Sequence, residues 1–198
     1  MIVKLRIADL KSAFLASGEM SVKKTVRFVE EWFEFAAASL LCRGILLIPR
    51  HDPEALGWRQ RLRPWLESPR QHKVGQHLKY DRHVFANHGI ELRGIADDTL
   101  LESYVLESDK SHDLGALAMR HCGLETISYD AVTGKGAARI SFAQVALEQA
   151  AEYAAEDADV TLRVHQALAP QLAAEEKLER LYRDIELPLA AALYRMAR

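Results

Sequence analysis

Cysteine is scarce in this sequence. The 198 residues contain two cysteines, Cys42 and Cys122, which lie far apart and form no Cys-x-x-Cys pair. Structural zinc sites and disulfide-stabilised folds need clustered or paired cysteines. We therefore expect neither a zinc site nor a disulfide framework, and we predict that both thiols are inert members of a hydrophobic core.

Long hydrophobic runs and a large excess of one charge are also absent. The most apolar stretch, FAAASLLCRGILLI, is interrupted by Arg43 and Gly44 and is shorter than the ~20 residues that span a membrane. The formal net charge of −2 argues against a non-specific nucleic-acid binder. These features predict a cytoplasmic protein without membrane contact. A phosphate group would be repelled by the negative charge of the chain unless divalent cations lay between them.

What the sequence does contain is an alternation of strand and helix signals in a chain of single-domain length. A helix is expected over 53–67, kinked or shortened by Pro64, and a long alanine-rich helical run begins at Ser141. Between them the predicted elements are a strand over 72–77 ending near Gly75, a helix over 78–89 capped by Gly89, a strand over 90–98, a helix over 99–108 opened by Asp98 or Thr99, and a helix over 112–123 closed by Gly123. The alternation indicates an α/β fold.

The helix faces also predict part of the core. Apolar residues recur at helical spacing over 99–108 and 112–123, and such faces are normally buried. The residues expected to be largely buried are Leu100, Leu101, Tyr104, Val105, Leu114 and Leu117.

Two acidic positions stand out as candidates for metal binding. Tyr153 and Asp157 are four residues apart, which places them on one face of a helix, and Asp81 lies on another predicted helix just after a strand. Carboxylates from separate elements bind hard cations such as magnesium. Two such ions roughly 4 Å apart can support phosphodiester hydrolysis, and a nearby tyrosine hydroxyl could orient the attacking water. The alternative is an ordinary solvated helix face.

Several motifs together resemble one family. The segments VGQHLKYDRHVFANHGIELRGIADDTLLESYVLES, SHDLGALA, ISYDAVTGKGA and YAAEDADVTLRVHQAL closely resemble the 3′-5′ proofreading exonuclease domain of bacterial DNA polymerase I. The resemblance implies a ribonuclease H-like α/β fold with a mixed sheet flanked by helices. It also implies two divalent cations, magnesium or manganese, held by four acidic residues and aided by a tyrosine. Its substrate would be the 3′ end of single-stranded DNA.

The resemblance assigns the metal site. QHLKYD matches the second family motif and makes Asp81 a metal ligand, while YAAED matches the third and makes Asp157 a ligand and Tyr153 the water-positioning residue. Their carboxylates are then expected to share one site with Tyr153 on its wall. Glu156 and Asp159 are expected to be solvated.

The resemblance also suggests which residues meet the DNA strand. Gln76, Lys79 and Tyr80 match positions near the single-stranded end, and His77 stands where asparagine is frequent in the family. Tyr129 matches an aromatic position that can pack against a base, and base stacking is worth ~1–3 kcal/mol. The alternative for Tyr80 and Tyr129 is a half-buried place in the core. Asp98 belongs to the family pattern as a helix cap, not as a metal ligand.

The first family motif, a strand reading Asp-x-Glu, has no counterpart in residues 1–45. The best candidate there is Phe28-Val29-Glu30-Glu31, with Glu31 as the third ligand and Val29 in place of the aspartate. Alternatively, Glu30 and Glu31 belong to the polar face of a helix. We therefore expect an atypical segment over 1–45 and an exonuclease-like domain over 46–183. Residues 184–198 are expected to be the start of a polymerase-domain segment, without polymerase motifs.

Three functions remain open on this basis. The first is a DNA 3′-5′ exonuclease domain with an impaired site. The second is a degenerate domain that keeps the fold and binds nucleic acid or serves a structural role without catalysis. The third is a ribonuclease D-type RNA exonuclease, which fits the GKGA segment and the C-terminal segment less well.

Overall fold

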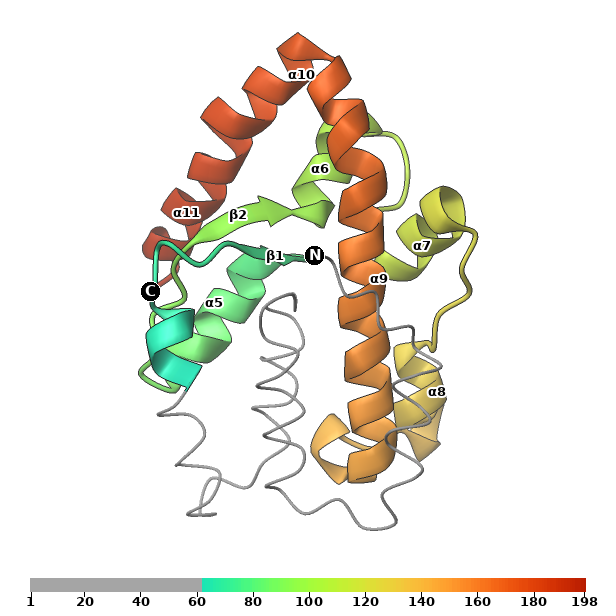
Figure 1. Cartoon of the computed structure of the whole chain (residues 1–198). Coiled ribbons are helices and arrows are strands. Elements are labelled where there is room, and N and C mark those ends of the chain that lie inside the picture. Colours follow the sequence, from blue (N-terminus) through green and yellow to red (C-terminus); the bar gives the residue numbers. More distant parts are fainter. Residues whose placement is uncertain (1–61) are drawn as a thin grey trace, which may run out of the picture.

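The structure is a computed structural model that describes residues 62–198 (Figure 1). Residues 62–66 are helical, and a short strand, β1 (Lys73–Gly75), follows. The next elements are α5 (Leu78–Asn87), β2 (Ile95–Asp98), α6 (Thr99–Leu106), α7 (Leu114–Cys122) and α8 (Tyr129–Thr133). After two single 3-10 turns, the chain enters α9 (Leu147–Ala174), α10 (Glu176–Leu181), the π-helical turn η3 (Tyr182–Glu186) and α11 (Leu187–Met196).

Helices dominate the described residues. The sheet there consists of β1 and β2, which are parallel and pair Gly75 with Asp98 at their carboxyl ends. The predicted strand over 90–98 is therefore confirmed only for its last four residues. No helix in this part of the chain is both long and apolar enough to cross a membrane.

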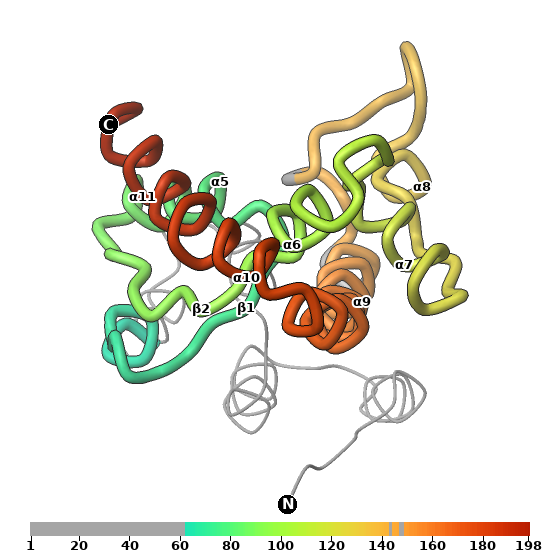
Figure 2. Tube along the Cα trace, turned by 90° about the horizontal axis from the view of Figure 1, so that it is seen from above, coloured from blue at the N-terminus to red at the C-terminus, as the bar shows by residue number. Residues whose placement is uncertain are grey.

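The long helix α9 connects several elements of the described part of the chain. It packs against α6, α7 and β1, and α10, η3 and α11 turn back from its end (Figures 1 and 2). The largest contact buries Leu117 and Ala118 of α7 against Val160, Val164 and Leu168 of α9. Cys122 packs against this cluster, and burial raises the pKa of its thiol, as expected of an inert cysteine. Cys42 lies outside the described residues.

The helix ends follow the local signals of the sequence. Gly89 and Gly123 adopt positive φ angles of 71° and 64° at the ends of α5 and α7, a conformation that glycine tolerates without steric cost. Asp98 is the N-cap of α6, because its side chain accepts a hydrogen bond from the backbone N–H of Leu100. The long helix begins later than predicted, at Leu147, because a 3-10 turn over Phe142–Gln144 with a capping box precedes it.

The burial prediction for α6 and α7 is only partly confirmed. Leu117 of α7 is fully buried, but Leu100, Leu101, Val105 and Leu114 are half-buried, and Tyr104 is 47% exposed. The polar side chains of α6 are buried instead, because each has a partner. These are Thr99 with the carbonyl of Gly75, Glu102 with His165, and Ser103 with His112. Hydrogen-bonded polar groups can thus occupy the interior side of this helix.

Candidate functional site

The second motif lies at the turn from β1 into α5. Gly75 ends the strand, and His77 takes the left-handed conformation, with φ 61° and ψ 47°, directly before the first helical residue, Leu78. Asparagine, aspartate and histidine adopt this conformation more readily than other non-glycine residues. The backbone therefore explains why a histidine can stand where asparagine is frequent in the resembled family.

Asp98 holds this turn in place from the neighbouring strand. Its Oδ1 accepts from the backbone N–H of His77 at 2.9 Å and its Oδ2 accepts from that of Leu78 at 2.8 Å, while Oδ1 also caps α6 through Leu100. The side chain is buried, and burial raises its pKa. The three backbone hydrogen bonds lower the pKa, but their effect is smaller than that of burial. Asp98 is thus a cap for two helices, and the sequence pattern predicts only the cap on α6.

The two predicted metal ligands are buried carboxylates. Asp81, in the first turn of α5, and Asp157, on α9, are each 7% exposed. Carboxylates are rarely buried unless they are paired or bind a cation. Tyr153 is also buried, one turn before Asp157 on α9. The solvated-face alternative is therefore wrong for Asp157, whereas a site shared by Asp81 and Asp157 stays a prediction.

The neighbouring acids have structural partners. Glu156 accepts a hydrogen bond from the backbone N–H of Ile127 at 2.6 Å, and Asp159 forms an ion pair with Arg163 at 2.7 Å. Both residues are half-buried, so the expectation that they are solvated is wrong. Glu156 thus fixes the backbone at Ile127, directly before α8.

The residues expected near DNA divide into two groups. Gln76 is half-buried, and its side chain donates to the carbonyl of His112 at 2.7 Å and accepts from Thr99. His77 and Tyr80 are exposed on the surface, with ring centroids 6.3 Å apart, and Tyr80 is 61% exposed. Tyr129 is 44% exposed. Both tyrosines therefore have exposed ring surface, Tyr80 more than Tyr129, and contact of any of these residues with DNA stays a prediction.

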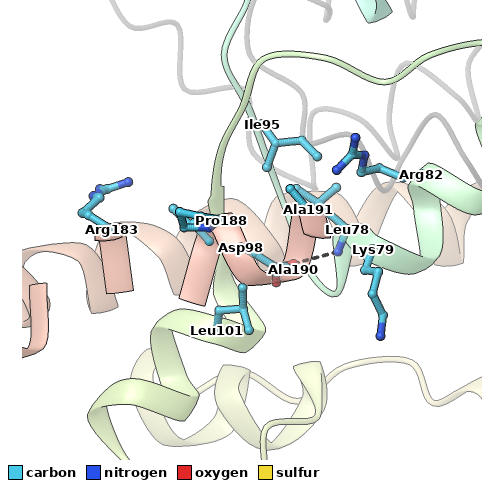
Figure 3. Close-up of a pocket in the computed structure, with 11 residues that line it drawn as sticks. Leu78, Lys79, Arg82, Ile95, Asp98, Leu101, Arg183, Pro188, Ala190 and Ala191 are labelled. Carbon is cyan, nitrogen blue, oxygen red and sulfur yellow. Dashed lines mark hydrogen bonds between the residues drawn. The ribbon is translucent and has the colours of Figure 1, made fainter. Parts of the chain in front are cut away.

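A hollow of about 260 Å³ lies between α5, β2 and α11, and Lys79 lines it (Figure 3). Its walls combine apolar side chains with the buried carboxylate of Asp98 and the cationic side chains of Arg82 and Arg183. The guanidinium of Arg82 stacks on Tyr194 of α11, 4.0 Å from the ring centroid. Neither Asp81 nor Asp157 lines this hollow, so it is separate from the predicted metal ligands.

A second group of ionisable side chains was not foreseen from the sequence. Asp97, Glu102 and His165 come from β2, α6 and α9, and one ligand atom of each lies within 4.8 Å of the others. His165 Nδ1 donates to Glu102 Oε1 at 2.8 Å, and Arg183 Nη1 pairs with Asp97 Oδ1 at 2.7 Å. The hydrogen bond to Glu102 raises the pKa of His165.

Charge balance argues against a metal in this group. The two carboxylates face the Arg183 guanidinium and His165, whose pKa is raised by the hydrogen bond to Glu102, and burial raises the pKa of Glu102 itself, so the group offers little negative charge to a cation. A metal would have to displace the His165 proton and approach Arg183. The chemistry of the donor set fits a buried ion-pair network better than a metal site. Spacing along the sequence could not reveal it, because its members are up to 86 residues apart.

The predicted third ligand belongs to the first family motif. Glu31, Val29 and residues 26–35 lie outside the described residues. The Asp-x-Glu pattern itself is not absent from the whole chain, as Asp52-Pro53-Glu54 and Asp184-Ile185-Glu186 have that form. Proline is unsuited to a strand interior, and 184–186 belongs to the π-helical turn beyond the third motif. Neither tripeptide therefore replaces the first motif.

Comparisons with known proteins identify the family. A family model described as 3′-5′ exonuclease matches residues 36–173. DNA polymerase I of Pseudomonas aeruginosa is 53% identical over 140 residues, covering 69% of this chain and 15% of that protein, and DNA polymerase I of Rhizobium leguminosarum is 43% identical over 137 residues, covering 69% and 13%. The chain thus spans only about a seventh of the length of these relatives.

A solved structure of a bacterial Pol1 is also similar to this chain. The POL domain of Pol1 from M. smegmatis in complex with DNA primer-template and dNTP has a TM-score of 0.53 and 27% identity, over 73% of this chain and 21% of that chain. Together with the family match over 36–173, this similarity shows that the chain belongs to the 3′-5′ exonuclease family and is homologous to the exonuclease domain of bacterial DNA polymerase I.

Proposed function

We propose that this exonuclease domain hydrolyses the 3′ end of single-stranded DNA, the reaction used in proofreading, and that its own rate is impaired. The observation that carries the proposal is the burial of Asp81 and Asp157 beside the family motifs that contain them. Buried oxygen donors at the two positions that match the family's ligand motifs support cation binding. The proposed fold of the whole domain is ribonuclease H-like.

The residues present fit a magnesium or manganese site. Asp81 and Asp157 would supply oxygen ligands, the donor type that these cations prefer, and Glu31 is the proposed third ligand. Bound divalent cations would lower the pKa of a water molecule and stabilise charge on the phosphate oxygens. We propose that Tyr153 orients that water through its hydroxyl. The water oxygen bonds to the terminal phosphorus, the bond to the preceding 3′ oxygen breaks, and a nucleoside 5′-monophosphate leaves.

The proposed impairment follows from the first motif. With Val29 at the aspartate position, the site has at most three carboxylates for four positive charges. Cation binding should weaken accordingly. The same observation favours the second candidate, a domain that binds single-stranded nucleic acid without hydrolysing it. We further propose the boundaries 1–45, 46–183 and 184–198 for the atypical segment, the exonuclease domain and the start of a polymerase-domain segment.

The test uses the purified chain with magnesium or manganese and a 5′-labelled single-stranded DNA, with an RNA of the same sequence in parallel. We expect very slow shortening of the DNA, a higher rate for Val29→Asp, and no shortening when Asp157→Ala is added to that variant. A wild-type rate equal to that of an intact proofreading domain would contradict the impairment. Binding without shortening in every variant would favour the second candidate, and preferential RNA shortening would favour a ribonuclease D-type activity.

A further inference from the structure

Three aromatic rings form a cluster beside the third motif. Tyr129 is the first residue of α8, Phe142 lies in the 3-10 turn before α9, and Tyr153 is on α9. The rings of Tyr129 and Phe142 are nearly parallel, with an interplanar angle of 21° and centroids 5.8 Å apart. Tyr153 meets both edge-on, at 6.4 Å from Tyr129 and 5.8 Å from Phe142. Phe142 is therefore in contact with both tyrosines.

The backbone around Phe142 is held at both ends. The loop between α8 and η2 projects from the molecule (Figure 2), but its base is closed because Ile140 N–H donates to the carbonyl of Thr133 at 2.8 Å. Ser141 and Gln144 then form a capping box around the turn that carries Phe142. The position of the Phe142 ring is thus set by local hydrogen bonds and by packing against Tyr153.

Tyr129 needs such support more than the other two rings do. It is 44% exposed, whereas Phe142 is half-buried and Tyr153 is buried. An exposed tyrosine in contact with solvent changes rotamer easily, and a base stacks well only on a ring whose plane is already fixed. Parallel-offset packing on Phe142 and edge-on packing on Tyr153 fix that plane.

We propose that Phe142 is a positioning residue that holds the Tyr129 ring in the plane in which it stacks on the terminal base of a single strand. The inference rests on the proposed function, since it concerns the same DNA end. Phe142 itself need not touch the DNA. Its ring contacts both Tyr129 and Tyr153, so the ring proposed to stack on the base and the residue proposed to orient water share one support.

The test measures binding of the full chain to two single-stranded DNAs that differ only at the 3′ end. One ends in 2-aminopurine, whose fluorescence falls when it stacks on a ring, and the other ends in an abasic nucleotide and carries a distant dye. The variants are Phe142→Leu, which keeps an apolar side chain without the ring, and Phe142→Tyr, which restores a ring. Tyr104→Leu is the matched control, because Tyr104 is an equally exposed tyrosine outside the cluster.

We expect Phe142→Leu to weaken binding of the 2-aminopurine strand by about 2- to 12-fold, the range of an aromatic pair, and to reduce its quenching. Binding of the abasic strand should not change, Phe142→Tyr should restore both values, and Tyr104→Leu should match the wild type. Equal weakening of both strands would mean that Phe142 acts only through stability and would overturn the inference. Unchanged quenching in Phe142→Leu would overturn it while leaving the proposed function intact. A wild-type chain that binds neither strand would overturn both.

Discussion

Replacing Asp98 by asparagine tests how the second motif is held. The carboxylate of Asp98 accepts three backbone hydrogen bonds, from His77, Leu78 and Leu100, at 2.8 to 3.1 Å. Asparagine has one acceptor oxygen, so if that oxygen keeps the Oδ1 position, the amide nitrogen faces the N–H of Leu78, which is a second donor. The cap on α6 survives, because asparagine caps helices as well as aspartate.

The expected cost comes from the buried N–H of Leu78. A buried donor without an acceptor costs ~1–3 kcal/mol, and loss of the negative charge at the N-terminus of α5 adds about 0.3–1 kcal/mol. Burial raises the pKa of Asp98, so its ionisation is itself unfavourable in the fold, and the neutral amide recovers part of this cost. We therefore expect Asp98→Asn to lower the free energy of unfolding by about 1–3 kcal/mol.

Urea denaturation followed by circular dichroism measures this change. Asp109→Asn is the control, because Asp109 is exposed and the same chemical change there should leave the free energy of unfolding within about 0.5 kcal/mol of the wild type. If Asp98→Asn were as stable as the control, the hydrogen bonds to α5 would contribute nothing net, and the reasoning would be refuted. Weaker binding of single-stranded DNA should accompany the loss, because α5 carries Lys79, Tyr80 and Asp81.

Three further predictions concern other buried or paired ions. Lys73 is fully buried, its Nζ donates to the carbonyls of Trp65 and Ser68 at 2.8 Å, and burial lowers its pKa to about 8. Because the unfolded chain keeps that proton to higher pH, the free energy of unfolding should rise from pH 8 toward 10.5. Lys73→Met should remove this rise in urea titrations. The pKa of Glu107 is lowered to about 2 by Lys110, Arg120 and His121, so the stability that its carboxylate contributes should be lost as pH falls from 4.5 toward 2. Glu107→Gln should therefore make the melting temperature less dependent on pH in this range. An unchanged pH dependence would contradict this. Asp81→Asn removes a buried charge and should abolish any stabilisation by manganese in thermal melts, whereas Asp113→Asn on the surface should retain it; equal manganese shifts in both variants would exclude Asp81 as a ligand.

Local signals account for what could be predicted of the fold. Gly89 and Gly123 mark helix ends because the chain needs positive φ there, and Asp98 marks the start of α6 because its side chain reaches a backbone N–H two residues later. The family motifs also identified Asp81 and Asp157, which are buried as ligands would be. These features depend on a few neighbouring residues, so a single sequence contains them.

Features that depend on distant partners could not be predicted. The apolar spacing of α6 suggests that Leu101 and Tyr104 face inward, but Glu102 is buried because His165, 63 residues away, donates to it. The second role of Asp98 depends on residues 20 and 21 positions earlier. Hydrophobic periodicity cannot report a buried polar face, since it treats every charged residue as exposed.

The link between the C-terminal turn and β2 has a consequence for synthesis of the chain. The hydroxyl of Tyr182 accepts from the backbone N–H of Asp98 at 3.0 Å and donates to Asp97, and Arg183 binds the carbonyl of Ala96. These contacts close a loop of more than eighty residues, the slowest kind to form. During synthesis, the backbone N–H of Asp98 therefore gains this acceptor only once Tyr182 has emerged from the ribosome, although the family match ends at residue 173. A nascent chain stalled before that tyrosine leaves the amide of Asp98 without its acceptor, so we expect β2 to reach its full stability only late in translation.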